Sequence, residues 1–165
     1  DPRSGLVAVG GRGQKIELWN STLAGNSQYG LELSQWEGTV ELHGSEISGN
    51  KQGGLVAAGL ERLVFEDAQV VRNLGVGAAI EETLVEVWST VFEDNLRQGL
   101  VLGAGSSGAI EMSRFANNDG LRLENTGALT VRGRDQARPG YGNIAHQSCD
   151  HLSFMVIEQV FVFSR

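Results

Sequence analysis

Cysteine is nearly absent from the sequence. Cys149 is the only one among 165 residues, so no disulfide can form within the chain. No apolar run approaches the roughly 20 residues that a membrane-spanning helix needs, so membrane insertion is not expected. Lysine and arginine total 13 against 20 aspartates and glutamates. The resulting net charge of −7 argues against a nucleic-acid partner, which would require a basic face.

Proline is also scarce, at 2 residues, whereas glycine is abundant, at 23. Six of the glycines recur just before a short apolar segment, and the spacings between them fall from 25 through 24, 23 and 22 to 21 residues. These glycines are Gly5, Gly30, Gly54, Gly77, Gly99 and Gly120. A repeat of about 20 to 50 residues indicates a solenoid, in which each unit buries its apolar face against the next.

Each repeat unit contains two further apolar segments after the one that follows the glycine. A pair with one residue between its members recurs at Ile16/Leu18, Val40/Leu42, Leu63/Phe65, Val85/Val87 and Ile110/Met112. A third position recurs at Leu23, Ile47, Val70, Phe92 and Phe115. Alternation with period two indicates strands, and no unit has room for a helix of about ten residues.

The predicted fold is therefore all-β: a right-handed parallel β-helix of about six coils, each of 21–25 residues with three short strands. A left-handed hexapeptide helix is disfavoured because the period is not a multiple of six. The coils are expected over residues 1–133. Residues 134–165 are expected to form a loop and a C-terminal segment that caps the last coil.

An asparagine stands four residues before the glycine that opens most of the units. The series comprises Asn26, Asn50, Asn73, Asn95 and, in the fifth unit, Asn118 or its neighbour Asn117. Side-chain amides stacked in register can hydrogen-bond from one coil to the next. The sequence thus predicts an asparagine ladder.

The motif Ser45-x-Ile47-x-x-Asn50-x-x-x-Gly54-Leu55, echoed from Ser21 to Leu31, resembles the repeat of the right-handed parallel β-helix superfamily, which includes pectate-lyase-like proteins. The resemblance covers residues 1–133 and implies the fold. Members that cleave polysaccharides use acidic clusters: lyases pair calcium-binding carboxylates with a basic residue, and hydrolases use close aspartates. By that resemblance, Asp67 and Asp94 are candidate catalytic residues, although no catalytic motif of the family surrounds them.

Two sets of residues are expected to point outward from the second strand and to bind a ligand. The first is a column of glutamates interrupted by Val64: Glu17, Glu41, Glu86 and Glu111. Stacked carboxylates repel one another, and a calcium ion could relieve this repulsion; the alternative is a solvated face. The second set is Trp19 and Trp88, which either stack on sugar rings or pack against turn loops. No cofactor other than calcium is expected.

Two further motifs have simpler explanations. Gly103-x-Gly105-x-x-Gly108 matches a dinucleotide fingerprint by letter, but it falls between two strands of one coil and is expected to be a turn. His146, Cys149, Asp150 and His151 are metal-ligand types. They also allow a Cys–His nucleophile, or simply a polar end loop.

We favour a non-catalytic module of a larger secreted or surface protein, with a structural or polysaccharide-binding role. One alternative is a lyase or hydrolase of acidic polysaccharides; another is an assembly module that associates end to end through its open coils. Asp1 falls at the ladder position of its unit, four residues before Gly5, so further coils or a cap of a larger protein are expected to precede it.

Overall fold

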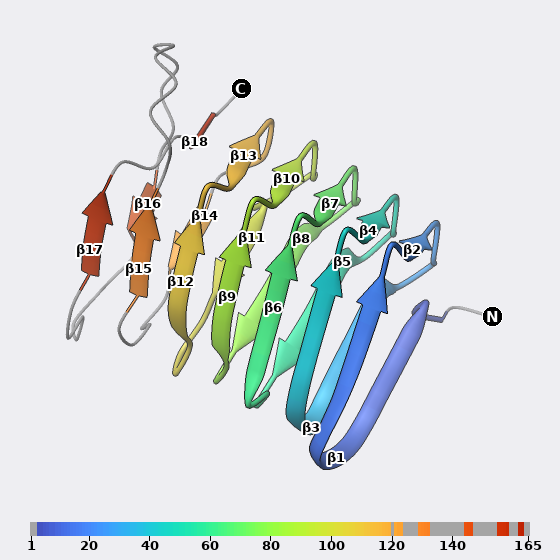
Figure 1. Cartoon of the computed structure of the whole chain (residues 1–165). Coiled ribbons are helices and arrows are strands. Elements are labelled where there is room, and N and C mark those ends of the chain that lie inside the picture. The colour runs from blue at the N-terminus through green and yellow to red at the C-terminus, as the bar shows by residue number, and fades with distance from the viewer. Residues whose placement is uncertain are drawn as a thin grey trace.

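A computed structural model describes residues 3–119, 121–123, 129–132, 144–146, 155–158 and 162–163. Every regular element in these ranges is a β-strand, and every pairing is parallel. The strands stack coil upon coil from β1 at one end to β17 at the other (Figure 1). The predicted all-β solenoid is confirmed.

The strands form three faces, and each of the first five coils contributes to all of them in turn. The first face contains the N-terminal parts of β1 (Leu6–Trp19) and β3 (Tyr29–His43), then β5 (Gly53–Ala58), β8 (Val76–Glu81), β11 (Leu100–Leu102), β14 (Leu121–Leu123) and β16 (Ile144–His146). The second face contains the C-terminal parts of β1 and β3, then β6 (Arg62–Glu66), β9 (Leu84–Trp88), β12 (Ser107–Glu111), β15 (Leu129–Arg132) and β17 (Met155–Glu158). The third face contains β2 (Thr22–Ala24), β4 (Glu46–Ser48), β7 (Gln69–Val71), β10 (Val91–Glu93), β13 (Arg114–Ala116) and β18 (Val162–Phe163).

The first two coils depart from the predicted three short strands. Here β1 and β3 run without a break through the corner between the first and second faces (Figure 1). This corner is longest in the first coil and becomes one residue shorter in each of the next three. Its flanking inward residues are Ala8 and Ile16, Leu33 and Val40, Ala57 and Leu63, and Ile80 and Val85. The shrinking corner therefore accounts for the fall in glycine spacing from 25 to 22.

Trp36 fills the widened corner of the second coil. The indole lies so close to Gly11 of the first coil that a Cβ there would be 2.7 Å from its ring. The side chain is buried, and its Nε1 is the one buried side-chain nitrogen or oxygen in the described part of the chain without a hydrogen-bond partner. Glycine at position 11 thus makes room for the largest side chain of the core.

Inward residues of successive coils stack into continuous apolar columns. Leu31, Leu55, Ala78, Leu100 and Leu121 form the first of these and are almost fully buried. On the third face Phe92 stacks on Phe115, with ring centroids 4.9 Å apart and planes at 2°, and it meets Phe65 at 5.8 Å. Burial of these columns is the main source of stability.

The asparagine ladder is confirmed, with Asn118 rather than Asn117 as its fifth member. Each Oδ1 of Asn50, Asn73, Asn95 and Asn118 accepts both the backbone N–H and the Nδ2 of the asparagine one coil earlier, at 2.8–3.1 Å. The Nδ2 of each of these four also donates to a backbone carbonyl of the previous coil's third-face strand. Four buried amides are therefore satisfied without water.

Each of the two corners that flank the third face contains one residue per coil in the left-handed backbone region in the first five coils. Between the second and third faces these residues are Asn20, Gly44, Asp67, Ser89 and Met112; after the third face they are Gly25, Gly49, Arg72, Asp94 and Asn117. Asparagine, aspartate and glycine tolerate this conformation best. The Gly103–Gly105 segment is likewise a turn between β11 and β12, as predicted. No helix in the described ranges is long and apolar enough to cross a membrane.

Candidate functional site

The outward surface of the second face carries a concentration of charged and aromatic side chains. The strand register places them in three columns along the stack: Lys15, Thr39, Arg62 and Leu84; Glu17, Glu41, Val64 and Glu86; and Trp19, His43, Glu66 and Trp88. The corresponding outward column of the first face is Val7, Glu32, Val56, Ala79 and Val101, which is mostly apolar. The second face is therefore the candidate site.

Glu41 lies at the centre of the ionic network on this face. Its Oε2 is 3.0 Å from Lys15 Nζ, which is also 2.8 Å from Glu17 Oε1. Its Oε1 is 3.6 Å from an Arg62 nitrogen. The Glu41 side chain is only 12% exposed, so these contacts are partly shielded from solvent. Lys15 thus joins two carboxylates from adjacent coils that would otherwise repel each other.

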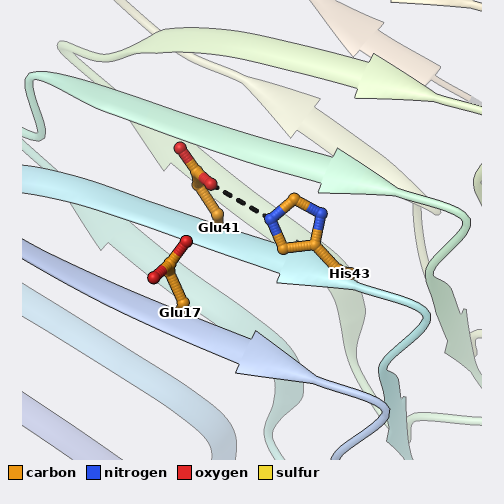
Figure 2. A group of neighbouring side chains, drawn as sticks. All are labelled: Glu17, Glu41 and His43. Carbon is orange, nitrogen blue, oxygen red and sulfur yellow. Dashed lines mark hydrogen bonds and ion pairs between the residues drawn. The ribbon is translucent and has the colours of Figure 1, made fainter.

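His43 bridges two carboxylates and supports an aromatic ring. Its Nε2 is 3.0 Å from Glu41 Oε2 and its Nδ1 is 2.7 Å from Glu66 Oε2. The dashed line in Figure 2 marks the contact with Glu41. Because a neutral imidazole has only one N–H, two carboxylate partners favour the doubly protonated cation. The Trp19 indole stacks on this ring with centroids 3.9 Å apart and planes at 15°.

Arg62 clamps the next glutamate along the stack. Its Nε is 3.0 Å from Glu86 Oε1 and its Nη2 is 2.7 Å from Glu86 Oε2. This is the bidentate geometry of a strong arginine–carboxylate pair. The Trp88 side chain lies beside Glu86 and contributes, after Arg62, to lowering the pKa of that carboxyl. Trp88 is half-buried, in contrast to Trp19, which is 60% exposed.

These contacts shift the acid–base equilibria of the network. Burial alone would raise the pKa of Glu41, but hydrogen bonds from Lys15 and His43 outweigh it and lower that pKa below its ordinary value. The hydrogen bond from Arg62 lowers the pKa of Glu86. Burial would lower the pKa of His43, but its bonds to Glu41 and Glu66 raise it overall. At neutral pH the network therefore contains paired, charged groups.

The raised His43 pKa predicts a loss of stability on the alkaline side of neutrality. Unfolded histidine titrates near pH 6.5, whereas folded His43 holds its proton to higher pH. The contribution of protonated His43 to the free energy of unfolding is therefore fully present below about pH 6.5, and it is lost as the pH rises through the folded pKa. Urea midpoints measured from about pH 6 to about pH 9 should fall across this range.

The control for this prediction is His43→Gln, which removes the ring but leaves the other two histidines in place. The difference between the two pH profiles isolates His43, because His146 and His151 are present in both proteins. If the variant loses stability with pH as steeply as the parent protein does, His43 is not the titrating group.

Comparison with protein families agrees with the architecture. A family model described as the right-handed β-helix region matches residues 2–135, which span the coils. The chain belongs to the right-handed β-helix family. No curated protein and no solved structure gives a significant match to this β-helix.

The structure corrects the place of Glu111 on this β-helix. Inward Val85 and Val87 pair with Gly108 and Ile110, rather than with Ile110 and Met112. Glu111 consequently pairs with Trp88 and stands in the column of Trp19 and His43, not in the glutamate column, whose fifth member is Ala109. A slip of two residues preserves the alternation, and a glycine at an inward position gives no apolar signal, so the sequence could not reveal it.

Asp67 and Asp94, the catalytic candidates, are not brought together. Asp67 lies at the corner that precedes β7, and Asp94 at the corner that follows β10, which are opposite ends of the third face. Asp94 accepts a hydrogen bond from Asn117 at 2.9 Å, and both aspartates are exposed. A hydrolytic pair requires carboxyl groups close together, so these two residues do not form one.

Among the described residues, one group could hold a metal cation: Glu17, Glu41 and His43. Each offers one ligand atom, and these three atoms lie within 4.8 Å of one another. Figure 2 shows them on adjacent strands, β1 and β3. Lys15 already places its ammonium against both of these carboxylates, and Arg62 occupies Glu86. Calcium binding by the glutamate column stays a prediction.

The residues that sequence reasoning missed are the cations Lys15, His43 and Arg62. Their signal was available, since each stands two residues from an outward column position. The side chains of the His146–His151 motif lie outside the described residues.

Proposed function

We propose that this β-helix is a non-catalytic polysaccharide-binding module of a larger secreted or surface protein, and that the second face around Trp19 is its binding surface. The observation that carries the proposal is the state of Trp19: its ring is 60% exposed, yet it is held flat on His43. An exposed indole in a fixed orientation is suited to stack on the apolar side of a sugar ring.

The surroundings of Trp19 supply the polar half of such a site. The Glu17 and Glu66 side chains are 42% and 55% exposed and can accept hydrogen bonds from sugar hydroxyls. Their partners Lys15 and His43 hold them in place, so little side-chain freedom is lost on binding. Parallel strands about 4.8 Å apart place further polar and aromatic side chains along the stack, Glu41, Glu86 and Trp88 among them, where an extended polymer could reach them.

The test is a glycan-array scan of the protein without substitutions, run once with calcium and once with chelator. The polymer that binds is then titrated. Trp19→Ala should weaken binding by about 30-fold or more, the effect of removing an aromatic residue that dominates an interface. Trp88→Ala should have a smaller effect, because that ring is half-buried against Glu86.

Two controls separate stacking from folding. Trp19→Phe keeps an aromatic platform and should retain most of the affinity, whereas Leu96→Ala removes an exposed apolar side chain that follows the third face and should change nothing. An unchanged affinity in Trp19→Ala, with the fold intact, would show that the indole is not part of the binding surface.

A further inference from the structure

On the second-face strands β1, β3, β6 and β9, each cation of the three columns is engaged by carboxylates of the same face. In β1, β3, β6 and β9, Lys15 contacts Glu17 and Glu41, His43 contacts Glu41 and Glu66, and Arg62 contacts Glu86 and Glu41; these three are the cations of the described columns. Four carboxylates therefore surround three cations. Over these four strands the face is rich in charge but offers no positive group without a negative partner.

From this pairing we infer that the glycan bound by the second face is uncharged. The inference rests on the proposed function and specifies its ligand class. An anionic sugar would have to displace a glutamate from a cation, exchanging one charge-assisted hydrogen bond for another of similar strength. The displaced glutamate would then stand beside the incoming anion, and the net charge of −7 adds to the repulsion.

An uncharged sugar meets none of these costs. Its hydroxyls can donate to the exposed oxygens of Glu17 and Glu66 while every ion pair remains in place. Its apolar ring face can cover the Trp19 indole, which is the exposed aromatic surface of the site. The face thus presents acceptors and an aromatic plane, which suit a neutral polymer.

The experiment compares polymers that share a backbone and differ in charge. Hydroxyethyl cellulose is paired with carboxymethyl cellulose, and highly methyl-esterified pectin with polygalacturonate, and each is titrated at low salt so that repulsion is not screened. We expect a neutral polymer to bind, its charged counterpart to bind at least about tenfold more weakly, and Trp19→Ala to weaken binding of the neutral polymer by about 30-fold or more.

The outcomes distinguish the class of the ligand from the existence of the binding face. If a charged polymer binds as tightly as its neutral counterpart and still depends on Trp19, the ligand-class inference is wrong while the binding face stands. If no polymer of either charge binds, or if binding ignores Trp19→Ala, the proposed function fails and the inference fails with it.

A pair of variants tests whether the ion pairs themselves exclude anions. Glu86→Gln removes the main partner of Arg62 on the second face, and Glu93→Gln removes the partner of Arg114, 2.7 Å away on the third face. Both remove one negative charge. Gain of binding to the anionic polymer in Glu86→Gln alone supports the inference, whereas an equal gain in both variants, or in neither, contradicts it.

Discussion

Asn73→Ala should destabilise the protein by about 3 to 5 kcal/mol, because it leaves two buried donors without acceptors, each at a cost of about 1–3 kcal/mol. Asn73 is fully buried, and its Oδ1 accepts from both the backbone N–H and the Nδ2 of Asn50 at 3.0 Å. Its own Nδ2 donates to Ile47 and Asn95. Urea unfolding followed by far-ultraviolet circular dichroism measures the loss.

Asn26→Ala is the matched control, because it removes the same side chain from the end of the ladder. Asn26 is half-buried, and its Nδ2 donates to Asn50 Oδ1, which would keep the bond from the Asn26 backbone N–H. The expected loss is therefore about 1 kcal/mol, the net value of one hydrogen bond. Equal losses at the two positions would mean that burial does not set the contribution of the ladder.

Phe92→Ala should cost about 3–5 kcal/mol, the usual range for removing a buried aromatic side chain. The ring is fully buried between two others, at 4.9 Å from Phe115 and 5.8 Å from Phe65, so neither neighbour can move into the space without losing its own contacts. The measurement is again the free energy of unfolding in urea, together with the cooperativity of the transition.

Two variants of the same coil calibrate this result. Phe92→Leu keeps much of the volume and should lose clearly less than Phe92→Ala. Leu96→Ala removes a side chain that is 61% exposed and should stay within about 0.5 kcal/mol of the parent protein. A loss in Phe92→Ala no greater than that in Leu96→Ala would be incompatible with the stacked rings.

The hydrophobic core and the proposed binding surface lie on opposite sides of the same strands. On β3, Leu42 points into the core, whereas its neighbours Glu41 and His43 point outward. The core columns and the ladder fix the spacing of the coils, and that spacing places Lys15 against Glu41 and Trp19 against His43. Substitutions on the outward side can therefore test binding without disturbing the core.

The fold could be predicted because its signals are local and repeated. Alternation such as Leu31-x-Leu33 indicates a strand in a few residues, and the recurrence of Asn50, Asn73 and Asn95 before a glycine indicates stacked coils. The lengths of the first two strands could not be predicted in this way. β1 and β3 continue through the corner between the first and second faces, where Trp36 packs over Gly11 of the neighbouring coil, a contact that no local pattern indicates.

The candidate site was predicted only in part. Trp19, Glu17, Glu41 and Glu86 do stand on one outward face, since strand alternation alone decides which side chains point outward. Glu111 was assigned to the wrong column because its coil is offset by two residues, a shift that alternation does not register.

The sequence by itself therefore determined the period, the all-β class, the ladder and the direction in which each strand residue points, since all of these follow from local alternation and from recurrence. Only the tertiary structure decided which charges meet. Lys15 and Glu41, Arg62 and Glu86, and His43 and Glu66 come from different coils, and their contact depends on the number of residues in each corner and on side-chain reach across parallel strands. Corner length varies from coil to coil, so pairing across coils cannot be read from one period of the repeat.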